Sequence, residues 1–127
     1  MSVLQTPNIH LVAVYGTLKR GMSNHDLLQA SFFLGEDTLT SVTLYDLGLF
    51  PAAKFKVSDG ITVELFKIDD ATLTCLDRLE GYRPHDPEQS FYHRHLIKTR
   101  HGNAWVYIYC GGVEFWDPIR KGAWMPD

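Results

Sequence analysis

Hydrophobic and polar positions alternate with a strand-like period over several segments of the chain. A nearly continuous apolar run over residues 9–15 (IHLVAVY) ends at Gly16 and is typical of a buried central strand. Apolar and polar residues alternate over 39–47 (LTSVTLYDL) and more regularly over 61–69 (ITVELFKID). The pattern therefore predicts one buried strand followed by two strands that each have a buried face.

The second half of the chain adds a helix and a hairpin. Three leucines recur at helical spacing between Asp69 or Asp70, which are suitable N-cap residues, and Gly81, which is a typical helix stop. Residues 91–99 and 103–110 read as strands joined by the polar turn RHGN, which predicts a β-hairpin.

The remaining segments are less regular. Ser23 or Asn24 can cap a short helix in SNHDLLQA, and the stretch GLFPAAKF around Pro51 is expected to be a loop. The tail is expected to be irregular, with Trp116 and Trp124 covering a sheet edge. Several strands with one clear helix and no regular βαβ alternation predict an α+β fold: a small mixed sheet or barrel with one or two main helices.

Length and composition limit the architecture and the partners. The chain has 127 residues, 45% of them hydrophobic, and no repeat or linker divides it, so we expect one domain over 1–127. Its net charge of -3 is spread without blocks of like charge, which argues against nucleic acid as a partner. No leader pattern or membrane-length apolar run occurs, so we expect a cytoplasmic protein that does not bind membranes.

Two cysteines and six histidines provide little metal chemistry. Cys75 and Cys110 lie within apolar patterns without CxxC spacing, so we expect buried, reduced thiols. His93 and His95 share one strand face, but no further ligand of suitable spacing accompanies them, and we expect no metal site.

The turn YGTL after the first strand is the first candidate for chemistry. Successive backbone N–H groups of Gly-Thr-Leu can turn to one side and form a nest for an anion, for example a carboxylate or a developing oxyanion. The alternative is an ordinary turn in which Gly16 supplies a positive φ and Lys19 and Arg20 are solvated.

Glu80 is the second candidate, because it occupies the last turn of the predicted helix. The helix dipole, the like charge of Asp77 and apolar neighbours all raise the pKa of a carboxyl group there, toward the range of a general base. The alternative is an exposed glutamate compensated by Arg78 or Arg83.

Three tyrosines alternate with apolar residues in the predicted hairpin. They are either core residues or the wall of a pocket with hydroxyl groups as hydrogen-bond donors. These residues are Tyr92, Tyr107 and Tyr109.

The motifs together resemble a known family. The segments VYGTLKRGMSNH (14–25), LYDLGLFPA (44–52), LDRLEGY (76–82), YHR (92–94) and AWVYIY (104–109) have the order and spacing of gamma-glutamylcyclotransferase-like proteins. They are most similar to the small bacterial branch near gamma-glutamylamine cyclotransferase. YGTL alone is a weak motif, but its combination with LDRLEGY in one small domain is specific.

The resemblance implies a barrel-like α+β fold with a cavity for a gamma-glutamyl group. It implies that Tyr15, Gly16, Thr17 and Leu18 bind the substrate carboxylate and neighbouring oxygens, and that Glu80 is the acid/base. The pocket would also be lined by Tyr92, Tyr107 and Tyr109.

The implied activity is the release of 5-oxoproline and a free amine from a small gamma-glutamyl amine or peptide, without a cofactor. The protein would act as a monomer or homodimer. A non-catalytic protein that binds a small metabolite in the same pocket is the alternative, and a structural protein with a closed core is a third reading. Val63 stands where the family often has glycine, which would narrow the pocket.

Overall fold

The computed structural model describes residues 8–125, and its larger sheet is built around the first predicted strand. This strand, β1 (Ile9–Val14), pairs antiparallel with β5 (Ile61–Asp69) and parallel with β7 (Gly102–Tyr109). The outer strands are β2 (Phe32–Leu39), next to β5, and β6 (Tyr92–Thr99), next to β7. The central strand, β5 and the hairpin are confirmed, and the mixed sheet confirms the predicted α+β class.

A second, three-stranded sheet packs over one face of the first and has the order β4-β3-β8. It consists of β3 (Val42–Asp46), β4 (Pro51–Phe55) and β8 (Asp117–Ile119). The expectation of a loop around Pro51 is wrong, because Pro51 is the first residue of a strand, where its missing N–H is tolerated. The tail is also less irregular than predicted, since it supplies β8.

The strand predicted over 39–47 is shorter in the structure, where β3 covers Val42–Asp46. Strand β2, which precedes it, was not predicted. Residues 40 and 41 form the turn between β2 and β3. Strand β2 shows no clear alternation because its register against β5 shifts between Phe33 and Gly35, where Gly35 has a φ of 139°.

The main helix, α1 (Asp70–Glu80), begins and ends where its caps predict. The Asp69 side chain accepts a hydrogen bond from the backbone N–H of Thr72 at 2.8 Å. Gly81 adopts the left-handed conformation with φ 65°, and its N–H donates to the carbonyl oxygen of Arg78. The predicted short helix is a 3-10 turn, η1 (His25–Leu28), without a side-chain cap, and a second turn, η2 (Pro87–Gln89), precedes β6.

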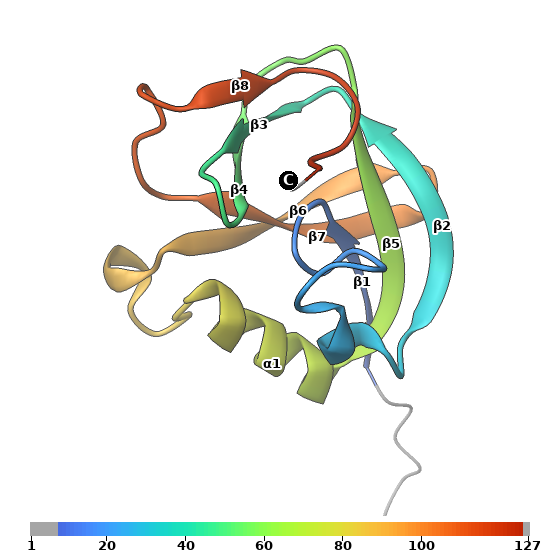
Figure 1. Cartoon of the computed structure of the whole chain (residues 1–127). Coiled ribbons are helices and arrows are strands. Elements are labelled where there is room, and N and C mark those ends of the chain that lie inside the picture. The colour runs from blue at the N-terminus through green and yellow to red at the C-terminus, as the bar shows by residue number, and fades with distance from the viewer. Residues whose placement is uncertain (1–7, 126–127) are drawn as a thin grey trace, which may run out of the picture.

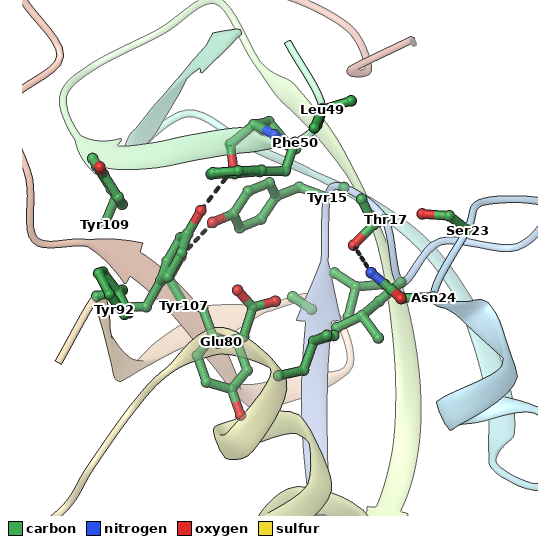
Figure 2. Close-up of a pocket in the computed structure, with 17 residues that line it drawn as sticks. Tyr15, Thr17, Ser23, Asn24, Leu49, Phe50, Glu80, Tyr92, Tyr107 and Tyr109 are labelled. Atoms are coloured by element: carbon green, nitrogen blue, oxygen red, sulfur yellow. Dashed lines mark hydrogen bonds between the residues drawn. The ribbon is translucent and has the colours of Figure 1, made fainter. Parts of the chain in front are cut away.

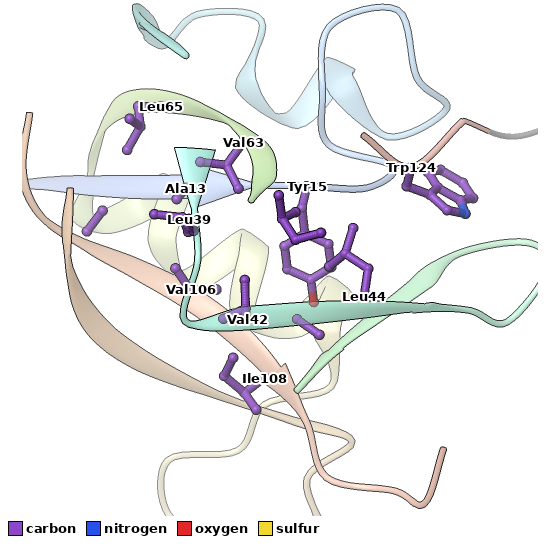
Figure 3. Packing of buried hydrophobic residues seen from close by; sticks show 13 residues of the cluster. Ala13, Tyr15, Leu39, Val42, Leu44, Val63, Leu65, Val106, Ile108 and Trp124 are labelled. Atoms are coloured by element: carbon purple, nitrogen blue, oxygen red, sulfur yellow. The ribbon is translucent and has the colours of Figure 1, made fainter. Parts of the chain in front are cut away.

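Alternate residues along β1 and just after it belong to two hydrophobic clusters on opposite faces of the larger sheet. Val12 and Val14 pack toward α1, whereas Ala13 and Tyr15 pack toward the second sheet. Figure 1 shows this layering, with α1 on one side of the central strands and β3, β4 and β8 on the other. The cluster between the two sheets is drawn in Figure 3, where Trp124 closes one end.

The exposure of two tryptophans and two cysteines can be compared with the expectations from the sequence. Of the two tryptophans expected to cover a sheet edge, Trp124 is buried and Trp116 is 46% exposed. The expectation of buried thiols is wrong: Cys75 lies on the solvent side of α1 and Cys110 follows the end of β7, and both are exposed and free. Within residues 8–125, no helix is long and apolar enough to cross a membrane.

The helix stop at Gly81 gives a stability prediction. A Cβ at Gly81 would lie 2.6 Å from Cδ2 of Phe91, whereas one at Gly21, whose φ is 82°, would meet nothing within 4 Å. Both alanine substitutions place a side chain in the unfavourable left-handed conformation, but only Gly81→Ala must also displace the ring of Phe91. We expect unfolding free energy to fall by roughly 1–2 kcal/mol in Gly21→Ala and roughly 2–4 kcal/mol in Gly81→Ala. Equal losses in denaturant titrations would contradict this account.

Candidate active site

A cavity of about 690 Å³ lies at the end of β1, between the loop that follows this strand and the last turn of α1 (Figure 2). The candidate residues of the sequence analysis all line it. The full set of lining residues is Ala13, Val14, Tyr15, Gly16, Thr17, Leu18, Ser23, Asn24, Leu49, Phe50, Pro51, Leu79, Glu80, Phe91, Tyr92, Tyr107 and Tyr109. A cavity between Gly16 and Glu80 is the opposite of the closed core that a purely structural protein would have.

The loop after β1 is held through its carbonyl oxygens. Lys19 N–H donates to the Gly16 carbonyl at 3.1 Å, and Asn24 N–H donates to the Thr17 carbonyl at 2.8 Å. The Asn24 amide also donates to the Thr17 hydroxyl at 2.9 Å. Within residues 8–125, the backbone N–H groups of Gly16, Thr17 and Leu18 have no protein acceptor. The loop is therefore fixed while three successive donors remain free for a ligand.

Gly16 is required by a close approach and not by a positive φ, so that part of the alternative reading is wrong. A Cβ at this position would lie 2.7 Å from Cγ of Pro51, the first residue of β4. Only glycine allows the end of one sheet and the start of the other to come this close.

The two basic residues after the loop are bound to the protein. Lys19 is buried, and its Nζ donates to the carbonyl oxygen of Trp124 at 2.9 Å. Burial lowers the pKa of Lys19, although Glu64 favours the charged form. The backbone N–H of Arg20 donates to Oε1 of Glu64 at 2.8 Å. The expectation that both side chains are merely solvated is wrong for Lys19, which ties the tail to this loop.

Glu80, the last residue of α1, directs its carboxylate into the cavity between the tyrosines and the loop (Figure 2). Desolvation by burial raises its pKa from 4.5 to about 7. Within the described part of the chain, Glu80 forms no ion pair or side-chain hydrogen bond, so neither Arg78 nor Arg83 compensates it. Burial, and not repulsion from Asp77, is the physical cause of the shift.

Asp77, one turn earlier on α1, has the opposite environment. Its carboxylate accepts hydrogen bonds from Nε of Arg94 at 2.9 Å and from Nη2 at 3.3 Å. The hydroxyl of Tyr107 donates to the same carboxylate at 2.7 Å. The paired Asp77 therefore fixes Tyr107 in the cavity wall, while Glu80 stays unpaired.

The tyrosines are both core residues and cavity wall, so the two readings of them are compatible. The hydroxyl of Tyr15 donates to the Tyr107 carbonyl at 2.6 Å, and that of Tyr92 donates to the Pro51 carbonyl at 3.1 Å. Burial raises the pKa of Tyr15, Tyr92 and Tyr107 well above the usual range, so these hydroxyls stay protonated. Each of these hydroxyl groups already uses its one hydrogen in a hydrogen bond to the protein. The three tyrosines therefore hold the cavity wall in place and are poor donors to a ligand. Tyr109 packs edge-on against the Tyr92 ring at 5.2 Å.

Several lining residues were not singled out by sequence reasoning. Leu49 and Phe50 come from the loop before β4, Leu79 from α1, and Phe91 from the position before β6. The only sequence signal for the first two was the motif LYDLGLFPA, because an apolar residue in a loop has no chemical mark of its own. Val63 lies in the core cluster and does not line the cavity, so it does not narrow it.

The histidines that share a face of β6 have other contacts. The ring of His93 is hydrogen-bonded to the Pro87 carbonyl at 2.8 Å, and its centroid lies 6.4 Å from that of His95. Residues 8–125 contain no group of three or more His, Cys, Asp or Glu side chains arranged to hold a metal ion.

Comparison with known proteins defines the class to which this fold and site belong. A family model described as gamma-glutamyl cyclotransferase, AIG2-like, matches residues 12–126. This match covers nearly the whole chain. The protein is therefore a member of the gamma-glutamyl cyclotransferase, AIG2-like family, as its motifs predicted.

Individual relatives agree with this assignment. A Vibrio cholerae protein, whose name gives gamma-glutamylcyclotransferase as a provisional assignment, is 40% identical over 116 residues, which cover 91% of this chain and 95% of the relative. The gamma-glutamylcyclotransferase family protein YtfP of Escherichia coli K12 is 35% identical, with 90% and 95% covered. The solution structure of Escherichia coli ytfP superposes with a TM-score of 0.68 at 33% identity, covering 91% of this chain and 96% of that one. An aig2-like protein from mouse has the same fold, with a TM-score of 0.68 at 20% identity over 92% of this chain and 88% of its own.

The raised pKa of Glu80 predicts a pH-dependent stability. The folded state holds this proton up to about pH 7, whereas the unfolded chain releases it near 4.5, so the wild type loses stability as pH rises between these values. The variant Glu80→Gln has no such loss. We expect it to unfold with up to about 3 kcal/mol more free energy than the wild type at pH 8 and with a similar free energy at pH 4. Thermal unfolding across pH measures the difference.

The exposed Glu88 provides the matched control, since Glu88→Gln removes the same charge outside the cavity. A constant difference between Glu80→Gln and the wild type from pH 4 to pH 8 would show that Glu80 does not titrate as described.

Proposed function

We propose that this protein is a gamma-glutamyl cyclotransferase that releases 5-oxoproline and a free amine from a small gamma-glutamyl amine or peptide. One observation supports this most strongly: an unpaired carboxyl group with a pKa of about 7 shares a cavity with three free backbone N–H donors. A group that titrates near neutral pH suits proton transfer, and adjacent N–H donors suit a carboxylate or an oxyanion.

The reaction needs few parts because the substrate contains its own nucleophile. The α-nitrogen of the glutamyl group forms a bond to the γ-carbonyl carbon, which closes a five-membered ring, and the bond from this carbon to the leaving nitrogen breaks. Two protons pass from the α-nitrogen to the leaving nitrogen, so the amine departs as an ammonium ion. Because the attack is intramolecular, positioning supplies much of the acceleration.

In this mechanism Glu80 carries both protons in turn. Its carboxylate first accepts a proton from the α-ammonium, which makes the nitrogen nucleophilic, and the resulting acid then protonates the leaving amine. The cycle repeats once and returns Glu80 to its starting state. A pKa of about 7 suits both steps, because the same group must be a base and an acid at one pH.

The loop after β1 holds the other end of the substrate. We assign the N–H groups of Gly16, Thr17 and Leu18 to the α-carboxylate and to the oxygen that becomes negative during ring closure. The tyrosines form the wall that fixes the glutamyl chain, with Tyr15, Tyr92 and Tyr107 held by their own hydrogen bonds.

Replacement of Glu80 separates this enzyme from the alternative, a protein that only binds a gamma-glutamyl metabolite. Gln keeps the shape of the side chain but removes the proton acceptor, so Glu80→Gln should release 5-oxoproline at least about a hundredfold more slowly than the wild type. Substrate binding, measured by calorimetry, should persist. The measurement is 5-oxoproline released from a panel of gamma-glutamyl compounds, with Glu88→Gln as the charge-matched control.

The outcomes are distinct. Equal turnover by Glu80→Gln and the wild type would place the base elsewhere. If neither protein releases 5-oxoproline from any compound although both bind one, the binding protein becomes the correct description.

The loop predicts anion binding that is independent of turnover. When 5-oxoproline is titrated into labelled protein, the amide resonances of Gly16, Thr17 and Leu18 should shift together, because their N–H groups lack a protein acceptor. The amide of Gly35, in the bulge of β2, serves as the remote control. Shifts confined to surface residues outside the cavity would contradict the proposed nest.

A further inference from the structure

Four apolar side chains that line the cavity are also exposed to solvent, and they are here called the apolar rim. Leu49 and Phe50 come from the loop between β3 and β4, Leu79 from α1 and Phe91 from the segment before β6. All four are open to solvent, and Leu49 and Phe91 are 87% and 68% exposed. Figure 2 shows Leu49 and Phe50 on the side of the cavity opposite Glu80. Exposed apolar groups gathered at a cavity mouth are typical of a surface that a ligand covers.

The cavity is also poor in charge. Of the residues that line it, Glu80 is the one side chain with a formal charge at neutral pH; the other polar lining groups are hydroxyls, one amide and backbone. The nearby Lys54 is not part of the lining, and its Nζ donates to the Tyr109 carbonyl at 2.7 Å. A charged ligand group packed against the rim side chains would therefore lose part of its water without gaining an opposite charge from the lining.

These two observations bear on the amine that leaves, and the inference rests on the proposed function. Gly16 and Leu18 are buried and Glu80 is less exposed than the four rim residues, so we assign the glutamyl group to this inner part of the cavity. The remainder of the substrate then extends from the γ-carbonyl toward the rim.

We propose that the substrates are gamma-glutamyl amides of apolar amines, alkyl or aryl. The part of the substrate that extends from the amide nitrogen away from the glutamyl group carries no charge. Such an amine buries apolar surface against Leu49, Phe50 and Phe91. Gamma-glutamyl amino acids and peptides end in a carboxylate, and diamine conjugates end in an ammonium group. The apolar rim provides no opposite charge for either group. The chemistry is that of the ring closure above and needs no further reactant.

Three substrates of matched length test the proposal: gamma-glutamylpentylamide, gamma-glutamylputrescine and the gamma-glutamyl conjugate of 4-aminobutyrate. They share the alkylamide bond and end in a methyl, an ammonium and a carboxylate group, respectively. We expect kcat/KM for release of 5-oxoproline to be at least about tenfold higher for the pentylamide than for either charged substrate.

A charge placed on the rim tests the structural cause. Leu49→Lys puts a cation at the mouth, and Val57→Lys, at a position 84% exposed but outside the cavity, adds the same charge elsewhere. Leu49→Lys should raise kcat/KM for the 4-aminobutyrate conjugate relative to the pentylamide by about threefold to tenfold. Val57→Lys should leave the ratio of the wild type unchanged.

The results separate this inference from the function on which it rests. If the charged substrates are used as well as the pentylamide or better, the apolar preference is wrong while the cyclotransferase proposal stands. If Leu49→Lys and Val57→Lys change the ratio equally, the rim does not select the amine. If no substrate yields 5-oxoproline, the proposed function itself fails, and this inference fails with it.

Discussion

The candidate site depends on the close approach of the first residue of β4 to the end of β1. The ring of Pro51 lies against Gly16 so closely that any side chain there would overlap it. The carbonyl oxygen of the same proline accepts a hydrogen bond from the hydroxyl group of Tyr92, which belongs to the first sheet. Pro51 thus joins the two sheets at the edge of the cavity by a steric contact and a hydrogen bond. The missing N–H of proline does not matter at this point, because a strand can begin without it.

Two carboxyl groups one helical turn apart on α1 show how the fold separates a structural charge from a reactive one. Asp77 is paired with Arg94 and Tyr107, and this pairing fixes part of the wall. Glu80 faces the cavity without such partners, and its pKa rises to about 7. Neighbouring carboxyl groups with different environments are a common way to obtain a group that exchanges protons near neutral pH.

The sequence predicted those parts of the fold whose causes are local. Strand β5 was predicted with its correct bounds, and helix α1 begins after Asp69, one of the two expected N-caps, and ends before Gly81. Alternation and caps belong to the segments themselves. Strands β2 and β4 were not predicted, because a bulge at Gly35 interrupts one and the other starts with Pro51 and exists through its pairing with β3.

The site shows the same division. Motifs were sufficient to select the loop, Glu80 and the tyrosines, but not the apolar residues Leu49, Phe50, Leu79 and Phe91 that also line the cavity. The position of Glu80 at the end of a helix suggested a raised pKa. Three causes of that shift were expected: the helix dipole, repulsion from Asp77 and apolar neighbours. Burial among neighbours raises the pKa, whereas the charge of Asp77 is paired with Arg94, which is distant in the chain. Likewise, no local pattern shows that Lys19 is buried against the tail, or that the tyrosine hydroxyls are occupied by backbone acceptors. These features arise from tertiary contacts.

The unpaired state of Glu80 has a consequence for how substrate binding and proton transfer are coupled in the proposed mechanism. Above pH 7 the empty cavity contains a carboxylate that has lost hydration and gained no protein partner, which is unfavourable for the folded state. The α-ammonium of a gamma-glutamyl compound is the partner that the protein lacks, so its binding relieves this cost and makes proton transfer to Glu80 short. A protein arginine or lysine in the same place would stabilise the carboxylate permanently and lower its pKa, and the group would no longer accept a proton at neutral pH. The absence of a cation from the lining residues described here is therefore part of the site's chemistry.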